Sequence, residues 1–110
     1  MAKNYVQEGD VIDYVNASGS TITSGTPVLI GARLGVALAD IANGATGSVQ
    51  VEGVFTVTKL GTDVVAAGAL LYWDNTNKRL TTTASGNTLS GFAVAAAGSG
   101  VTTVNIKINA

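Results

Sequence analysis

The sequence predicts an all-β, mainly antiparallel fold, in the form of a small compact barrel or clip-like domain of about eight short strands. The first observation is a period-two pattern over residues 48–58, in which apolar and polar side chains alternate. The second is the spacing of turn residues, because clusters of Gly, Asn, Ser and Thr separate the short apolar runs. The third is an internal echo between the two halves of the chain, which indicates a pseudo-symmetric β structure.

Residues 48–58 are expected to form one long bent strand near the middle of the domain. Val49, Val51 and Val57 lie on the apolar side of the alternation, which predicts one face on a core and one in water. Gly53 interrupts the pattern without a side chain to pack. A glycine at such a position indicates a bulge, a sharp bend or the close passage of another backbone.

The N-terminal half is expected to contain three further strands. Pro27 cannot donate to a ladder, so the second of them should be entered from a loop. Leu34, Leu38 and Ile41 also have helical spacing, but Gly35 would weaken a helix, and a strand is favoured. In order, the expected elements are a strand at 10–15, a loop at 16–25, and strands at 28–30 and 34–38, followed by a loop at 40–47.

The C-terminal half is expected to form a hairpin followed by two more strands. In the last strand Val104, Ile106 and Ile108 should face the core, while the polar residues between them face water. In order, the expected elements are a connection at 61–68 with room for one helical turn, a strand at 69–74, a turn at 75–78, a strand at 80–83, a turn at 85–87, a strand at 89–95, a loop at 96–100 and a strand at 102–108.

The two halves of the chain repeat one order of elements. Each contains a strand, then a strand of small residues with a glycine near its start, then a glycine loop and an alternating strand. The matched segments are 25–30 with 68–73, 34–39 with 90–95, and 47–51 with 103–106. The second half carries an insertion at 75–86, which is the predicted hairpin region.

The composition argues against several classes of function. Charged residues make up 12% of the chain and the net charge is -1, so no basic excess is available for nucleic acid. No apolar run is long enough for a membrane span, and no secretion signal is recognisable, so synthesis in the cytoplasm is expected. Cys and His are both absent, which removes disulfides, thiolates and the commonest general base and metal ligand.

We therefore expect no catalytic residue, no metal site and no cofactor. Seven Asp and Glu residues leave a small hydrolase with a carboxylate pair as an alternative, although all of them fall at predicted turns or on outward faces. Asp74-Asn75-Thr76-Asn77 is similar to the start of a calcium loop, but the remaining ligands are missing. A hairpin turn is the better interpretation of that segment.

Tyr72 and Trp73 form the one aromatic pair of the sequence, and we expect them at a subunit interface. Neighbouring residues of a strand point to opposite faces, so one ring should enter the core and the other should face outward. Shielding of both rings by loops is the alternative.

Residues 1–9 are expected to form an extended N-terminal arm, and residues 10–110 a single β domain. The arm is polar, lacks a clear period and ends in a glycine. A frayed terminus is one interpretation. A segment that orders on a partner, with Tyr5 and Val6 as apolar anchors, is the other.

Several short motifs in one order resemble a known family over nearly the whole chain. They are the opening Met-Ala-Lys-Asn-Tyr-Val-Gln-Glu-Gly-Asp-Val-Ile-Asp-Tyr, Leu34-Gly35-Val36-Ala37, Val51-Glu52-Gly53-Val54-Phe55, Leu71-Tyr72-Trp73-Asp74, Asn77-Lys78 and Gly91-Phe92-Ala93. The chain resembles the small capsid cement, or head decoration, proteins of tailed phages, a family formerly known only as a domain of unknown function.

This resemblance implies a homotrimer on the outer surface of the mature head, where it holds the shell against internal DNA pressure. The major capsid protein is then the partner, and the location is the virion after synthesis in the bacterial cytoplasm. The arm, with Lys3, Asn4, Tyr5 and Val6, would contact the shell or a neighbouring subunit. The alternative is a non-catalytic β module of a phage tail or cell surface that binds a glycan or a protein.

Overall fold

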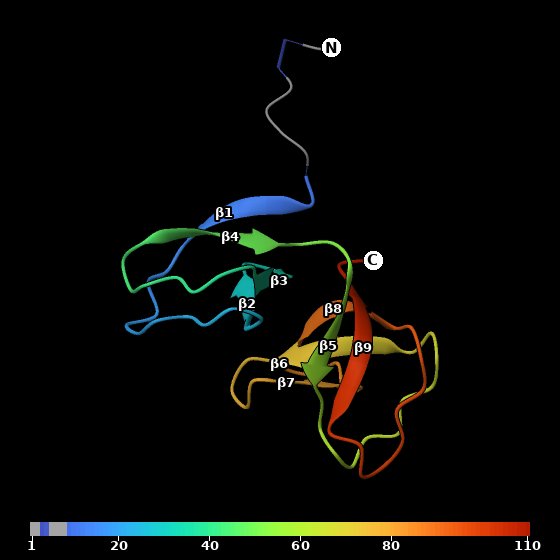
Figure 1. The fold of residues 1–110 in the computed structure, drawn as a ribbon. Helices are drawn as coiled ribbons and strands as arrows, with labels where there is room; N and C mark the ends of the chain where they lie inside the picture. Colours follow the sequence, from blue (N-terminus) through green and yellow to red (C-terminus); the bar gives the residue numbers. More distant parts are fainter. Residues whose placement is uncertain (1–2, 5–8) are drawn as a thin grey trace.

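The computed structural model describes residues 3–4 and 9–110, and within them it contains nine strands and no helix (Figure 1). The strands are β1 (Val11–Val15), β2 (Pro27–Ile30), β3 (Arg33–Ala37), β4 (Thr46–Gln50), β5 (Val54–Thr58), β6 (Leu70–Asp74), β7 (Arg79–Thr81), β8 (Thr88–Ala93) and β9 (Thr103–Ile108). All the strand pairs are antiparallel, which confirms the predicted fold class. The two sheets are open and do not close into a barrel, so the barrel that the sequence suggested is not formed.

The strands form two sheets, one from each half of the chain. The four-stranded sheet has the order β1-β4-β3-β2, and the five-stranded sheet has the order β5-β9-β8-β6-β7. The seven shorter strands predicted from the sequence are all confirmed, with ends that differ from the observed ones by at most two residues. Residues 33–37 form a strand, so the helical spacing around Leu34 does not produce a helix.

The single long strand predicted over residues 48–58 is wrong. The segment forms β4 and β5, which belong to different sheets. Gly53 lies between them with φ at +122°, a backbone conformation that side-chain-bearing residues rarely adopt. Its carbonyl accepts a hydrogen bond of 3.0 Å from the Ile108 amide. The glycine thus turns the chain out of one sheet and into the next, although the apolar alternation continues on both sides of it.

The pseudo-symmetry predicted from the sequence is present in the topology. Without β7, the sheet orders β1-β4-β3-β2 and β5-β9-β8-β6 are equivalent strand by strand. Each half also contains one isolated antiparallel bridge between loops, Ile22 with Ile41 and Val65 with Ala97. Each of these four residues is followed three positions later by a glycine with φ between +82° and +87°: Gly25, Gly44, Gly68 and Gly100. The hairpin that contains β7 is the insertion.

Two buried polar side chains occupy equivalent positions in the two halves. Asn16 directly follows β1 and is fully buried, and Lys59 directly follows β5 with 2% of its surface exposed. Asn16 Nδ2 donates hydrogen bonds of 2.8 Å to the carbonyls of Ser20 and Ile41. Lys59 Nζ donates to the carbonyls of Leu60 at 3.0 Å and Asp63 at 2.8 Å. Each buried side chain therefore has its donors satisfied by loop carbonyls, of which those of Ile41 and Leu60 also accept from the backbone amides of Ile22 and Asp63.

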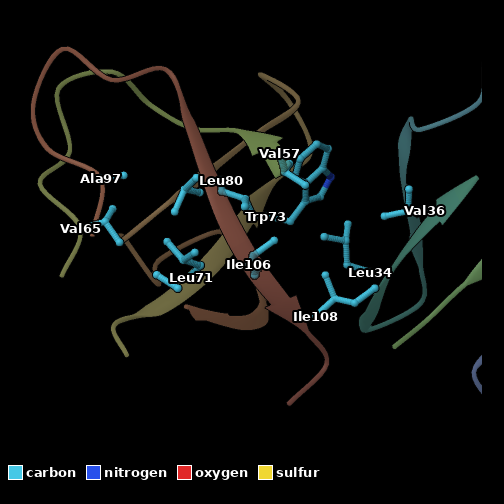
Figure 2. Close-up of a cluster of buried hydrophobic side chains, with 12 residues drawn as sticks. Leu34, Val36, Val57, Val65, Leu71, Trp73, Leu80, Ala97, Ile106 and Ile108 are labelled. Atoms are coloured by element: carbon cyan, nitrogen blue, oxygen red, sulfur yellow. The ribbon is translucent and has the colours of Figure 1, made fainter. Parts of the chain in front are cut away.

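The larger hydrophobic core joins the two sheets. Its buried side chains come mostly from the five-stranded sheet and its loops, but Leu34 and Val36 of β3 are also part of it (Figure 2). Asn109 reinforces this junction, because its Nδ2 donates to the carbonyls of Leu34 at 2.6 Å and Val51 at 2.7 Å, while its Oδ1 accepts from the Leu34 amide at 3.2 Å. A smaller core, with Ala37 and Val49 at its centre, occupies the other face of the four-stranded sheet.

Candidate interaction surface

The structure separates the two aromatic residues that the sequence assigned to an interface. Trp73 is 2% exposed and belongs to the larger core, where its ring lies close to Val57 (Figure 2). Its Nε1 donates a hydrogen bond of 3.2 Å to Asn75 Oδ1. Tyr72 points to the opposite face of the sheet and is half-buried. Of the two residues, Tyr72 is therefore the one that is accessible to a partner.

Tyr72 belongs to an apolar group on the face of the five-stranded sheet that points away from the core. The cross-strand neighbours Leu70 and Phe92 lie next to the pair formed by Tyr72 and Leu89. Leu70 is 52% exposed and Leu89 is 47% exposed. Lys107 is opposite Phe92 on β9, with its Nζ 5.9 Å from the centre of the ring, within range of a cation–π interaction. We call these five residues the outer patch.

A β-bulge brings Leu89 into the outer patch. The strand pairing between β6 and β8 shifts at this point, because Leu71 pairs with Gly91 and Tyr72 pairs with Leu89. Ser90 is the extra residue, and it is fully buried. The bulge re-aims the strand so that Leu89 emerges beside Tyr72. Of the outer patch, the sequence pattern pointed to Tyr72 but not to Leu70, Leu89 or Phe92. For Leu89 the reason is the bulge, which simple alternation does not reveal.

The residues predicted for the N-terminal arm are described only in part. Lys3 and Asn4 are exposed and lie in a turn. Tyr5 and Val6 lie outside the described residues. The assignment of these four residues to a contact with the shell therefore stays a prediction.

The Asp74 carboxylate serves as a structural hydrogen-bond acceptor. Asp74 accepts hydrogen bonds from the side chain of Asn77 at 2.8 Å and from the backbone amides of Asn77 and Thr76, which is the predicted hairpin turn. The Asn77 side chain is the largest of the causes that lower the pKa of Asp74. No group of three or more residues of metal-binding type occurs among residues 3–4 and 9–110.

Asp63 is held in a similar way. Burial acts to raise the pKa of Asp63, but hydrogen bonds from Thr81 Oγ1 and the Thr82 amide, together with the charge of Lys59, outweigh it and lower the pKa. A general acid in catalysis needs a raised pKa instead. Asp63 and Asp74 therefore act as hydrogen-bond acceptors, and neither has the raised pKa of a general acid.

A groove of about 730 Å³ lies between the two halves of the molecule. Tyr14, Trp73 and Lys78 contribute to its wall, which is otherwise rich in Ser and Thr from residues 18–26. None of the described residues that line it carries a carboxylate. The groove can offer hydroxyl groups to a polar ligand, but it has no acid–base pair.

In the part of the chain that the structure describes, no helix is long and apolar enough to cross a membrane.

Comparison with known proteins identifies the family. A family model described as phage cement protein matches residues 6–108, a range that includes all nine strands. No curated protein and no solved structure gave a significant match. Because the family model covers nearly the whole chain, the protein belongs to the phage cement protein family, whose members are structural, non-catalytic components of the virion capsid.

Proposed function

We propose that this chain binds the outer surface of the mature head of a tailed phage and stabilises the shell against internal DNA pressure. The observation that supports this role is the match to the phage cement protein model, which extends over both sheets. The partner would be the major capsid protein. Synthesis in the bacterial cytoplasm would precede assembly onto the head.

Binding to the assembled shell explains how a protein without an active site can reinforce a particle. A ligand that binds one state and not the other stabilises the bound state by mass action, by about 2.7 kcal/mol per site at a concentration 100 times Kd. Many copies on one head multiply this contribution. The low share of charged residues, 12%, suits a chain that packs against other proteins.

We further propose that the chain acts as a homotrimer with residues 1–9 as arms and residues 10–110 as the β domain. A trimer would present three arms to the shell, so that contacts of modest individual affinity add up through multivalency. Lys3, Asn4, Tyr5 and Val6 are the residues assigned to this contact, and Tyr5 and Val6 would supply its apolar part.

Deletion of residues 2–9 is expected to weaken binding to heads at least about 100-fold, because multivalent attachment is lost when the contacting segments are removed. The fold should survive, because the deletion ends before β1, which begins at Val11. The hydrogen bond of 2.8 Å from the Val51 amide to the Asp10 carbonyl, which joins the start of β1 to the end of β4, is also kept. Co-sedimentation with heads measures the first effect and thermal unfolding the second. A truncated chain that still saturates the heads would contradict the role of the arm.

The hydroxyl-lined groove supports a second candidate, a glycan-binding module on a phage tail or a cell surface. Ser and Thr at 18–26 would donate and accept hydrogen bonds to sugar hydroxyls. Binding to a glycan array, together with an absence of binding to heads, would favour this function over the cement role.

A further inference from the structure

The two halves of the molecule carry opposite charge. Residues 9–52, which form the four-stranded sheet, contain four carboxylates and one Arg, for a net charge of -3. Residues 53–110, which form the five-stranded sheet, contain four basic residues and two carboxylates, for a net charge of +2. Lys3 and Glu8 cancel, which gives the overall charge of -1. The nearly neutral total thus conceals an acidic sheet and a basic sheet.

The outer patch carries part of the basic charge. Lys107 extends over Phe92, next to the exposed side chains of Leu70 and Leu89. The patch lies on the far side of the five-stranded sheet from Leu34 and Val36, through which the other sheet of the same chain packs. It therefore cannot contact the acidic sheet of its own chain.

The acidic sheet has a matching exposed surface along β1. Asp13 and Val15 point to the face opposite Ile12 and Tyr14, which pack on the smaller core. Asp13 is exposed and Val15 is 59% exposed. Their cross-strand neighbours on β4, Ser48 and Thr46, are exposed as well. We call these four residues the β1 strip.

We propose that copies of this chain associate head to tail, with the outer patch of one copy on the β1 strip of the next. The contact pairs Lys107 with Asp13 and the exposed apolar side chains of the patch with Val15. A contact of patch on patch would instead bring two Lys107 side chains together, and like charges at an interface are unfavourable. The charge pattern therefore favours the strip of a second copy as the partner.

A contact between two different surfaces is heterologous, and it forms a closed ring when the rotation that relates neighbouring copies closes, as it does around a three-fold axis. This inference rests on the homotrimer of the proposed function and names the two surfaces that would build it. It is tested in solution without heads, so that its failure can be told apart from the failure of the cement role.

The test is a charge exchange in the full-length chain, read by sedimentation velocity over a range of concentrations. Lys107→Glu and Asp13→Lys should each weaken self-association about tenfold or more, since each places like charges at every contact. The double variant with both changes restores the opposite pairing and should recover to within about threefold of the native chain. Lys78→Glu changes the net charge as much as Lys107→Glu does, but from an exposed hairpin turn outside the patch, so it should have little effect.

A second variant tests the apolar part. Leu89→Ser should weaken association about tenfold, because Leu89 is an exposed side chain in the middle of the proposed contact. Far-UV circular dichroism confirms that each variant folds. Stronger association of the native chain at low salt than at high salt is expected as well.

Three results would overturn the inference: a native chain that stays monomeric at every concentration, a Lys78→Glu variant as impaired as Lys107→Glu, or a folded double variant that fails to recover. If Lys107→Glu associates normally but no longer binds heads, the outer patch is a shell contact, and the cement role stands without the head-to-tail ring. If the ring forms and responds to the charge exchange but the protein does not bind heads, the inference stands and the cement role fails.

Discussion

Replacing Gly91 with alanine is expected to prevent the chain from folding. Gly91 has φ at +147° and pairs with Ile108 in the middle of the five-stranded sheet. An added Cβ would overlap the carbonyl oxygen of Lys107 and lie 2.9 Å from its carbonyl carbon and 3.1 Å from the Cα of Ile108. These are backbone atoms of β9, so the clash can be relieved only by opening the contact between β8 and β9. The cost should be about 4 kcal/mol or more, at the upper end for a single substitution.

Gly98→Ala is the matched control for this change. An added Cβ at Gly98 meets no atom within 4 Å, and its φ does not require glycine. The free energy of unfolding should therefore stay within about 1 kcal/mol of the native value. Expression followed by circular dichroism and urea unfolding compares the two variants. A Gly91→Ala chain that unfolds at the same urea concentration as the Gly98→Ala chain would contradict the packing described for β8.

Replacing Trp73 with alanine is expected to lower the free energy of unfolding by about 3–5 kcal/mol, the range for removing a large buried aromatic side chain. Trp73 is 2% exposed and packs in the core that joins the two sheets. Its removal leaves a cavity in that core and takes away the donor to Asn75 Oδ1. Urea unfolding, followed by circular dichroism, measures the loss.

The neighbouring residue provides the control. Tyr72→Ala should cost about 1 kcal/mol or less, because its half-buried ring lies on the outer face of the sheet and leaves no cavity in the core. It should weaken self-association instead, since Tyr72 belongs to the outer patch. Equal losses of stability in the two variants would show that the assignment of inner and outer faces on β6 is incorrect.

Local pattern was sufficient to predict much of the fold. The alternation in β9 gave the correct buried side chains, Val104, Ile106 and Ile108, because one face of that strand packs on a core and the other is in water. The echo between the halves predicted a pseudo-symmetric β structure, because it reflects the same order of strands, loop bridges and turn glycines. Because both halves follow one pattern, the order of strands can be inferred from either half and checked against the other.

Pattern failed where two segments with the same period belong to different sheets. Val49 and Val57 are both buried, as the alternation predicts, but they lie in different cores. Periodicity reports that a face is buried and does not report against what it packs. Gly53 was the one sign in the sequence that the pattern is interrupted here. Its positive φ does not merely bend one strand but ends β4 and directs the chain into the other sheet.

The interaction surface was predictable only in part. Alternation predicted that Tyr72 and Trp73 point to opposite faces, but not which one is buried, since both are large aromatic side chains. Leu89 joins the outer patch through a bulge at Ser90, which depends on pairing with a distant strand. Lys59 can be buried because the carbonyls of two loop residues accept hydrogen bonds from its ammonium group. The sequence alone does not distinguish such a lysine from one on the surface.

Adding the purified protein to mature heads that lack it shows whether the chain binds and stabilises them. Co-sedimentation through a heat ramp measures both the bound amount and the temperature at which the heads rupture. We expect saturable binding in a fixed ratio to the major capsid protein, with decorated heads that rupture at a higher temperature than bare ones. Heads that bind none of the protein and rupture at an unchanged temperature would contradict it.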